Sequence, residues 1–118
     1  MADAQQKSLD APDQVLNMER GKFDIVEIAG GTVGRATFEP GWKWSEHEKP
    51  ALGAEGDYCD VAHFVYVAAG QIHVVFADGD ELDLKAGDVA TIPAGHDGWV
   101  VGDESATMFD FGGIAKPL

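Results

Sequence analysis

Short apolar segments separated by glycine-containing turns run through most of the chain. Residues 23–29 mix apolar and charged side chains in near alternation, and residues 32–39 follow the pair Gly30-Gly31, which tolerates the positive φ of a tight hairpin. Further apolar or alternating segments cover residues 61–68, 71–77, 81–86, 89–92, 99–101 and 107–111. Because no segment shows sustained helical periodicity, the pattern predicts roughly nine short β-strands in a sandwich or barrel.

Turn residues and polar stretches divide the chain. Asp78-Gly79 is a strong hairpin signal between two predicted strands. Residues 49–60 contain one proline and two glycines and show little periodicity, so we expect a loop there. Residues 1–12 are expected to form a flexible N-terminal arm, which either stays disordered or crosses to a second subunit. Residues 13–118 are then expected to form a single barrel domain.

A family resemblance lies in residues 87–95, which read Gly-Asp-Val-Ala-Thr-Ile-Pro-Ala-Gly. The second sequence motif of the cupins opens with a glycine, five residues, a proline, one residue and a glycine, and this segment matches those three anchors. The chain therefore resembles the cupin family over about residues 21–112. That resemblance implies an all-β fold, a single antiparallel jelly-roll β-barrel. It implies no single activity, because cupins include isomerases, dioxygenases, lyases, storage proteins and sensor domains.

The first cupin motif is matched in part. Gly41 and His47 have the spacing of its opening glycine and its first histidine. Lys49 stands where the second histidine of the motif falls. His63 lies seven residues before Gly70, which is the spacing of the glutamate in the motif.

Cupin enzymes typically hold one divalent metal inside the barrel with three histidines and a glutamate, so the resemblance implies a metal site. Successive side chains of a strand point to opposite faces, which places His63 on an inward row with Val65 and leaves His73 on the outer face. The usual histidine of the second motif falls at Gly98, and His96 has the same parity. We therefore expect His96 to reach toward the same interior.

Two ligand sets fit these spacings. In the first, His47, His63 and His96 hold the ion and water fills the open positions, although the Lys49 ammonium beside them disfavours a cation. In the second, Cys59 takes a histidine slot, and Cys59, His63 and His96 are the ligands. The candidate ions are Zn, Fe, Ni, Cu and Mn, and a thiolate ligand favours Zn, Cu(I) or Fe. No sequence signal supports an activated, nucleophilic Cys59 thiol.

Aromatic residues gather near the expected mouth of the barrel. Trp42, Trp44, Tyr58 and Trp99 are candidates to line a pocket for an apolar or aromatic ligand. The alternative is that these side chains pack in the core or in a subunit interface. Tyr66 has the parity opposite to His63, and we expect it to pack between sheets or subunits.

Charge limits the choice of partners. The 118 residues include 21 acidic and 8 basic side chains, which gives a formal net charge of −13. Phosphate contacts need Lys and Arg, so this balance argues against a nucleic acid partner and against an anionic membrane surface. The single cysteine, Cys59, excludes an internal disulfide. No apolar leader or spanning segment is visible, and we expect a cytoplasmic protein.

Two functions of different classes remain open. The first is a small metal-dependent enzyme, in which the ion polarises a carbonyl or carboxylate of a small organic substrate or activates water or oxygen. The second is a metal-free module that binds a small ligand or another protein, with His63 as a hydrogen-bonded core histidine. For both functions the resemblance implies a homodimer, with residues 61–67 and the N-terminal arm as candidate contacts.

Overall fold

The computed structural model describes residues 4–112, and its regular structure is almost entirely antiparallel β-sheet. Nine strands lie in this range: β1 (Gln14–Met18), β2 (Gly21–Ile28), β3 (Gly31–Phe38), β4 (His63–Ala69), β5 (Gln71–Phe76), β6 (Glu81–Lys85), β7 (Val89–Ile92), β8 (His96–Val100) and β9 (Ala106–Asp110). Six strands form one sheet in the order β1-β2-β3-β9-β4-β7, and three form a second sheet in the order β6-β5-β8. The predicted all-β fold is confirmed.

The segment between β3 and β4 differs from its prediction. It contains a π-helical turn, η1 (Trp44–Glu48), followed directly by a short α-helix, α1 (Lys49–Leu52), so the prediction of a loop throughout residues 49–60 is wrong. Pro50 lies in the first turn of α1, and Gly53 ends the helix in the left-handed conformation with φ 65°. None of the helices within residues 4–112 has the length and apolar character that crossing a bilayer requires.

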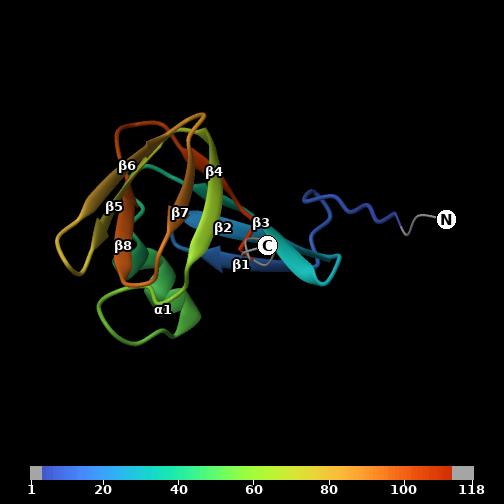
Figure 1. Ribbon diagram of the computed structural model, residues 1–118, viewed down its shortest axis with the longest axis horizontal. Helices are drawn as coiled ribbons and strands as arrows, with labels where there is room; N and C mark the ends of the chain where they lie inside the picture. The colour runs from blue at the N-terminus through green and yellow to red at the C-terminus, as the bar shows by residue number, and fades with distance from the viewer. Residues whose placement is uncertain (1–3, 113–118) are drawn as a thin grey trace.

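The barrel interior is built from alternate positions of the strands. Val65 and Val67 of β4 are fully buried, and Ile72 and Val74 of β5 are 3% exposed. Figure 1 shows β4 to β8 curled around this interior, with α1 at one end of the barrel. The alternation that predicted an inward row containing His63 is therefore correct, and it places that histidine at the rim of the apolar core.

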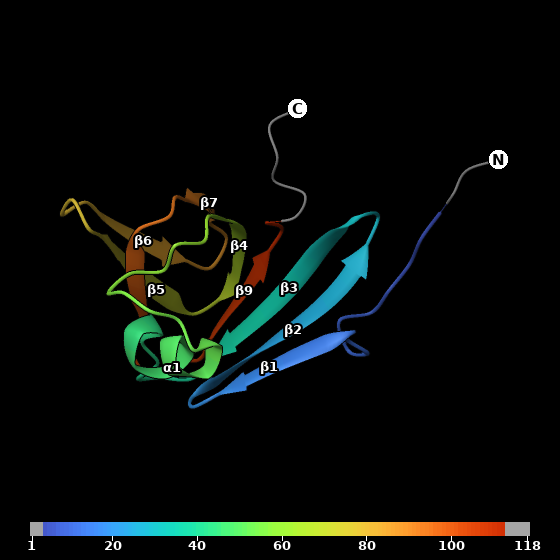
Figure 2. The same cartoon turned by 90° about the horizontal axis from the view of Figure 1, so that it is seen from below.

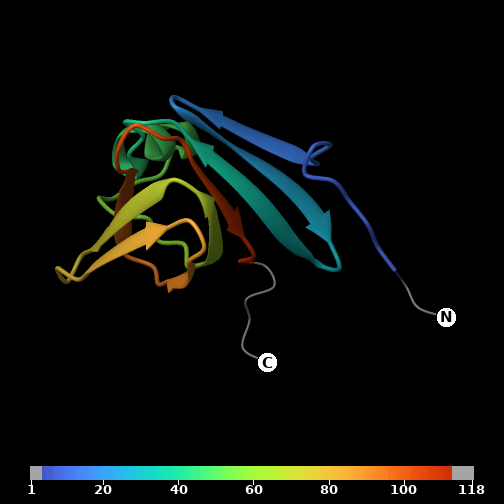
Figure 3. The ribbon, with the colours of Figure 1, turned by 90° about the horizontal axis from the view of Figure 1, so that it is seen from above.

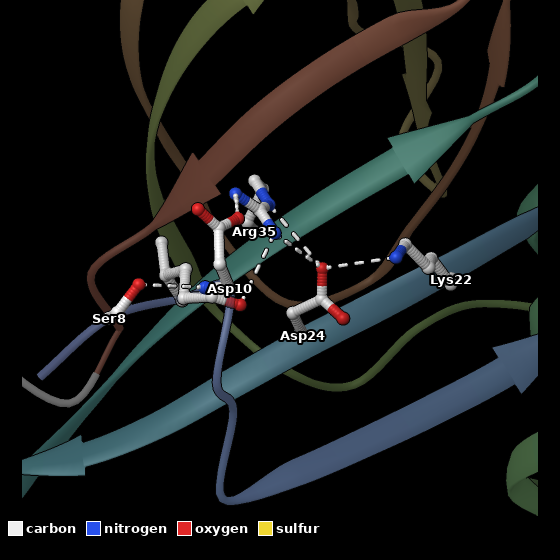
Figure 4. Close-up of polar contacts among 6 residues, drawn as sticks. Ser8, Asp10, Lys22, Asp24 and Arg35 are labelled. Carbon is white, nitrogen blue, oxygen red and sulfur yellow. Dashed lines mark hydrogen bonds and ion pairs between the residues drawn. The ribbon is translucent and has the colours of Figure 1, made fainter.

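The long β2–β3 hairpin runs on beyond the barrel, and β1, which the sequence pattern did not single out, lies along its edge (Figures 2 and 3). Arg35 on β3 binds the buried Asp24 of β2, with Nη2 3.0 Å from Oδ2. The same guanidinium also contacts Asp10 and the Leu9 carbonyl, as Figure 4 shows for Asp10. Part of the predicted N-terminal arm thus lies against the hairpin, while its flexibility stays a prediction.

Candidate metal centre

A thiol and two imidazoles meet inside the barrel. Cys59 lies in the segment before β4, His63 begins β4, and His96 begins β8. One ligand atom from each of these residues lies within 4.8 Å of the other two. The Cys59 N–H donates to the His96 carbonyl at 2.7 Å, and the Gly95 N–H donates to the Cys59 carbonyl at 2.7 Å. This backbone pairing holds the cysteine beside His96.

Both imidazoles are oriented through Nδ1. In His63 this atom lies 2.6 Å from Oδ2 of Asp110 on β9, and in His96 it lies 2.8 Å from the Pro93 carbonyl oxygen. A carbonyl oxygen can only accept, so Nδ1 of His96 carries the proton in the neutral ring and Nε2 keeps its lone pair. The same follows for neutral His63. Histidines that bind metals are usually held in this way, by a carboxylate or a backbone carbonyl on the other nitrogen.

The thiol and His63 are strongly coupled. Burial alone would raise the pKa of Cys59, but hydrogen bonds with His63 and His96 outweigh it and lower that pKa to about 6. Burial alone would lower the pKa of His63, but its hydrogen bonds with Asp110 and Cys59 raise that pKa to about 9. Sγ of Cys59 lies 3.8 Å from Nε2 of His63. Both shifts favour the thiolate form of the sulfur, which is the form that binds metals.

A cavity with about 50 Å³ of free volume lies next to the two histidines. Its walls are mainly apolar, and most of its polar groups belong to the centre described above. The residues that line it are Phe23, Phe38, Trp42, Trp44, Glu48, His63, Ile72, Val74, Ile92, His96, Gly98, Met108 and Asp110.

Glu48, the last residue of η1, brings a second carboxyl group to this cavity. Burial, together with the negative charge of Cys59, raises the pKa of Glu48 to about 7. A carboxyl group with that pKa exchanges a proton near neutral pH, which an ordinary surface glutamate does not. The cavity therefore combines candidate metal ligands with a group that can hold or release a proton.

The other two histidines lie away from this group. Nδ1 of His47 accepts the Lys43 N–H at 2.9 Å and so closes the first turn of η1. His73 lies on the outer face of β5, as its parity predicted, with its two ring nitrogens 2.5 Å from Asp83 and 3.0 Å from Glu81. Of the two ligand sets that the spacing allowed, the structure brings together the one that contains Cys59.

The four aromatic candidates divide into two pairs. Trp42 and Trp44 are each 5% exposed and line the cavity. Tyr58 is 41% exposed, and Trp99 packs against His73 on the outer side of the small sheet. The first pair is placed to touch a ligand in the cavity, whereas Trp99 and Tyr58 are placed on the surface.

Asp110 and Glu48 are the site residues that the sequence analysis missed. A signal for Asp110 was available, because it shares the inward parity of Met108 in a strand that is otherwise apolar at those positions. A buried carboxylate on the inward row of a strand is costly unless it is paired or hydrogen-bonded, and here its partner is His63. The sequence carries no comparable signal for Glu48, since its place in the cavity depends on the irregular turn η1.

The comparisons with known proteins agree with this fold. A family model described as a cupin domain matches residues 59–112, which contain Cys59, both imidazoles and Asp110. No curated protein matches the chain.

Solved structures with the same fold include oxalate decarboxylases. The enzyme from Bacillus subtilis, in a structure at pH 4.6, is 24% identical, with a TM-score of 0.60 over 83% of this chain and 26% of that one. The enzyme from Lactobacillus farciminis, in a formate complex, is 22% identical, with a TM-score of 0.60 over 82% and 30%. A protein of unknown function from Vibrio parahaemolyticus is 14% identical, with a TM-score of 0.55 over 78% and 87%. The chain thus spans less than a third of the decarboxylases.

Proposed function

We propose that this chain, which matches a cupin family model over residues 59–112, is a cupin that binds one divalent metal ion through Cys59, His63 and His96. A small organic ligand would occupy the adjoining cavity. The observation that carries it is the orientation of the two rings. Each has Nδ1 tied to an oxygen acceptor, which leaves Nε2 as the coordinating atom.

The donor set suits a transition metal. A thiolate and two imidazoles favour Zn, Cu or Fe over ions that prefer oxygen ligands, such as Mn. Three protein ligands also leave a coordination position open, which is the arrangement of catalytic rather than structural zinc sites. A bound ion would supply Lewis acidity toward a carbonyl or carboxylate of the ligand.

The surrounding residues have separate tasks in this function. Asp110 holds His63 in its coordinating orientation, and the indoles of Trp42 and Trp44 keep bulk water out of the cavity. Glu48 can hold a proton at its carboxyl oxygen and release it near neutral pH. These features support a metal-dependent enzyme in preference to a passive binding module.

Elemental analysis tests the metal site. Protein purified without chelator and without a nickel column should contain about one ion of Zn, Fe or Cu per chain. Cys59→Ser, His63→Ala and His96→Ala should each lose most of this metal, because each removes a ligand. His73→Ala is the matched control and should keep it, since that ring faces outward. His47→Ala should also keep it.

Two results would overturn the metal site. One is less than a tenth of an ion per chain in the wild-type protein after incubation with Zn, Fe, Ni, Cu and Mn in turn. The other is full metal content in folded Cys59→Ser protein. Circular dichroism on every variant separates the loss of a ligand from a failure to fold, and Cys59→Ser is the informative variant because it preserves the shape of the side chain.

A second proposal concerns self-association. The outward positions of β4, β7 and β9 form an outer face that carries no acid, although the chain has 21 acidic residues. Tyr66 of this face pairs across the sheet with Val89 and Phe109, and Tyr66 is 41% and Val89 64% exposed. We propose that the outer face binds a second copy of the chain. Its members are Phe64, Tyr66, Ala68, Val89, Thr91, Thr107 and Phe109.

A further inference from the structure

Trp44 has an unsatisfied hydrogen-bond donor in the barrel interior. Within residues 4–112, its Nε1 is the one buried side-chain nitrogen or oxygen that lacks a hydrogen-bond partner. The side chain is 5% exposed and lines the cavity next to the two histidines. A buried donor of this kind has given up its water without gaining an acceptor, which is costly and therefore uncommon in native proteins.

Trp42 shows that the same cavity wall can satisfy an indole internally. Its Nε1–H donates to Sδ of Met18 at 3.4 Å, and its ring stacks on Phe38 at 3.7 Å between centroids. Trp44 has no such neighbour in the described residues. Both side chains are buried to the same degree, so the two indoles differ in whether the N–H has an acceptor.

No acceptor that lines the cavity is hydrogen-bonded to the Trp44 N–H. Asp110 binds His63 through Oδ2 and accepts the Gly112 N–H through Oδ1 at 2.8 Å. The Glu48 carboxyl also lines the cavity but makes no hydrogen bond with the Trp44 N–H, and the rest of the lining is mainly apolar, with side chains such as Ile72 and Met108. An acceptor for the Trp44 N–H would therefore come from a molecule that enters the cavity.

The size of the cavity limits that molecule. About 50 Å³ of free volume corresponds to roughly four water-sized positions, at about 10–15 Å³ each. This space suits a ligand of about three or four non-hydrogen atoms. A bulky aromatic acid or a sugar would not fit without movement of the walls.

We infer that the cavity binds a small carboxylate of about formate or acetate size, and that Nε1–H of Trp44 donates to one of its oxygens. The inference rests on the proposed function, because the second oxygen would take the open position on the ion held by Cys59, His63 and His96. The Trp44 N–H needs one acceptor, and the open position on the ion needs a second. A carboxylate provides both, because it carries two acceptor oxygens on one carbon. Trp44 is then the residue that selects an oxygen acceptor over a donor.

Nuclear magnetic resonance on the zinc-loaded full chain tests this role directly. The three tryptophans give three indole N–H signals, and Trp44→Phe identifies which of them belongs to Trp44. Acetate or formate should move the Trp44 signal downfield in a saturable manner, because a new acceptor deshields the proton. The Trp42 and Trp99 signals are internal controls and should move less, since Trp42 already has its acceptor and Trp99 lies on the outer side.

Calorimetry compares acetate binding by the wild-type protein and by two matched variants. Trp44→Phe keeps an aromatic ring and removes the donor, and it should weaken acetate binding about tenfold, the value of one hydrogen bond to a charged acceptor. Trp99→Phe should leave acetate binding unchanged. Ethylammonium, which has similar size and no acceptor, should not move the Trp44 signal, and benzoate should fail to bind.

Zinc analysis of the same samples separates the failure of this inference from the failure of the metal site. Zinc at one ion per chain with no effect of either carboxylate on the Trp44 signal would overturn the inference and leave the metal site standing. Equal shifts with ethylammonium and acetate would also overturn it. A protein that binds no zinc but still shows the Trp44 shift would support the carboxylate and overturn the metal site.

Discussion

At the scale of single residues, the hydrogen bond between His63 and Asp110 controls the chemistry of the centre. The carboxylate holds a proton on the imidazole and so raises the pKa of His63 to about 9. The imidazolium in turn favours the thiolate form of Cys59, whose pKa falls to about 6. Asp110 therefore acts on the sulfur through the ring between them, much as a third residue orients the base of a nucleophilic cysteine.

The protonation of Cys59 gives a prediction at this scale. In metal-free protein, the thiolate absorbance at 240 nm should appear as the pH rises through about 6, instead of about 9. Asp110→Asn removes the charge that stabilises the imidazolium, so the midpoint should move upward toward the ordinary value for cysteine. The absorbance is measured by titration from about pH 4 to about pH 10, a range that contains both midpoints.

Two controls accompany the titration. Cys59→Ser should abolish the absorbance change, since the chain has one cysteine. Asp83→Asn removes a carboxylate that contacts His73 on the outer face, and it should leave the midpoint unchanged. An unchanged midpoint in folded Asp110→Asn protein would contradict the coupling described here.

At the scale of elements, the turn between β4 and β5 connects the large sheet to the small one. Gly70 forms this turn with φ 75°, and a Cβ atom built there would lie 2.6 Å from the Ser105 carbonyl oxygen and 2.7 Å from Cα of Ala106. Both contacts are with backbone, so no side-chain rotation relieves them. The turn thus needs glycine for two reasons, its left-handed conformation and the close approach of β9.

Gly70→Ala should therefore destabilise the protein by about 2–4 kcal/mol, the sum of a backbone penalty and overpacking against fixed atoms. Gly79 in the β5–β6 hairpin is the matched control, because its φ is 96° and its added Cβ would meet open space. Gly79→Ala should cost about 1–2 kcal/mol. Urea unfolding curves measure both free energies, and equal losses would show that the close approach of β9 does not matter.

At the scale of the whole molecule, a net charge of −13 opposes contact between two copies, and the repulsion is weakest where the contact surface carries no acid. The outer face of β4, β7 and β9 meets that condition and presents aromatic and branched side chains. The parity of Tyr66 led to the expectation that it packs between sheets or subunits, and the structure places it on this face with 41% exposure. Packing against a second subunit stays a prediction.

Light scattering tests that prediction. The wild-type chain should have twice its mass of 12.5 kDa, and added salt should favour the dimer by screening the repulsion between acidic copies. Tyr66→Glu should shift the mass to one chain, because it places a like charge in the interface. Tyr58→Glu is the matched control, since Tyr58 is equally exposed elsewhere on the surface. A wild-type mass of one chain would rule out the dimer.

The alternation of apolar positions and the placing of glycines were enough to determine the all-β class, most of the strands, and the faces of His63 and His73. These features are local, since the direction of a side chain in a strand depends only on its parity, and a turn depends on a few φ values. The sequence pattern did not predict the short edge strand β1 or the helical turns η1 and α1. Their form is decided by what they pack against and less by their own periodicity.

The composition of the centre was decided by the tertiary structure. The spacing allowed both His47 and Cys59 beside His63, and the backbone bridge between Cys59 and His96 is what brings the cysteine into the group. Asp110 reaches His63 across 47 positions of the chain, because β9 pairs with β4. Such contacts depend on which strands become neighbours and in which register, and a periodic pattern carries no information about partners that lie far apart in the sequence.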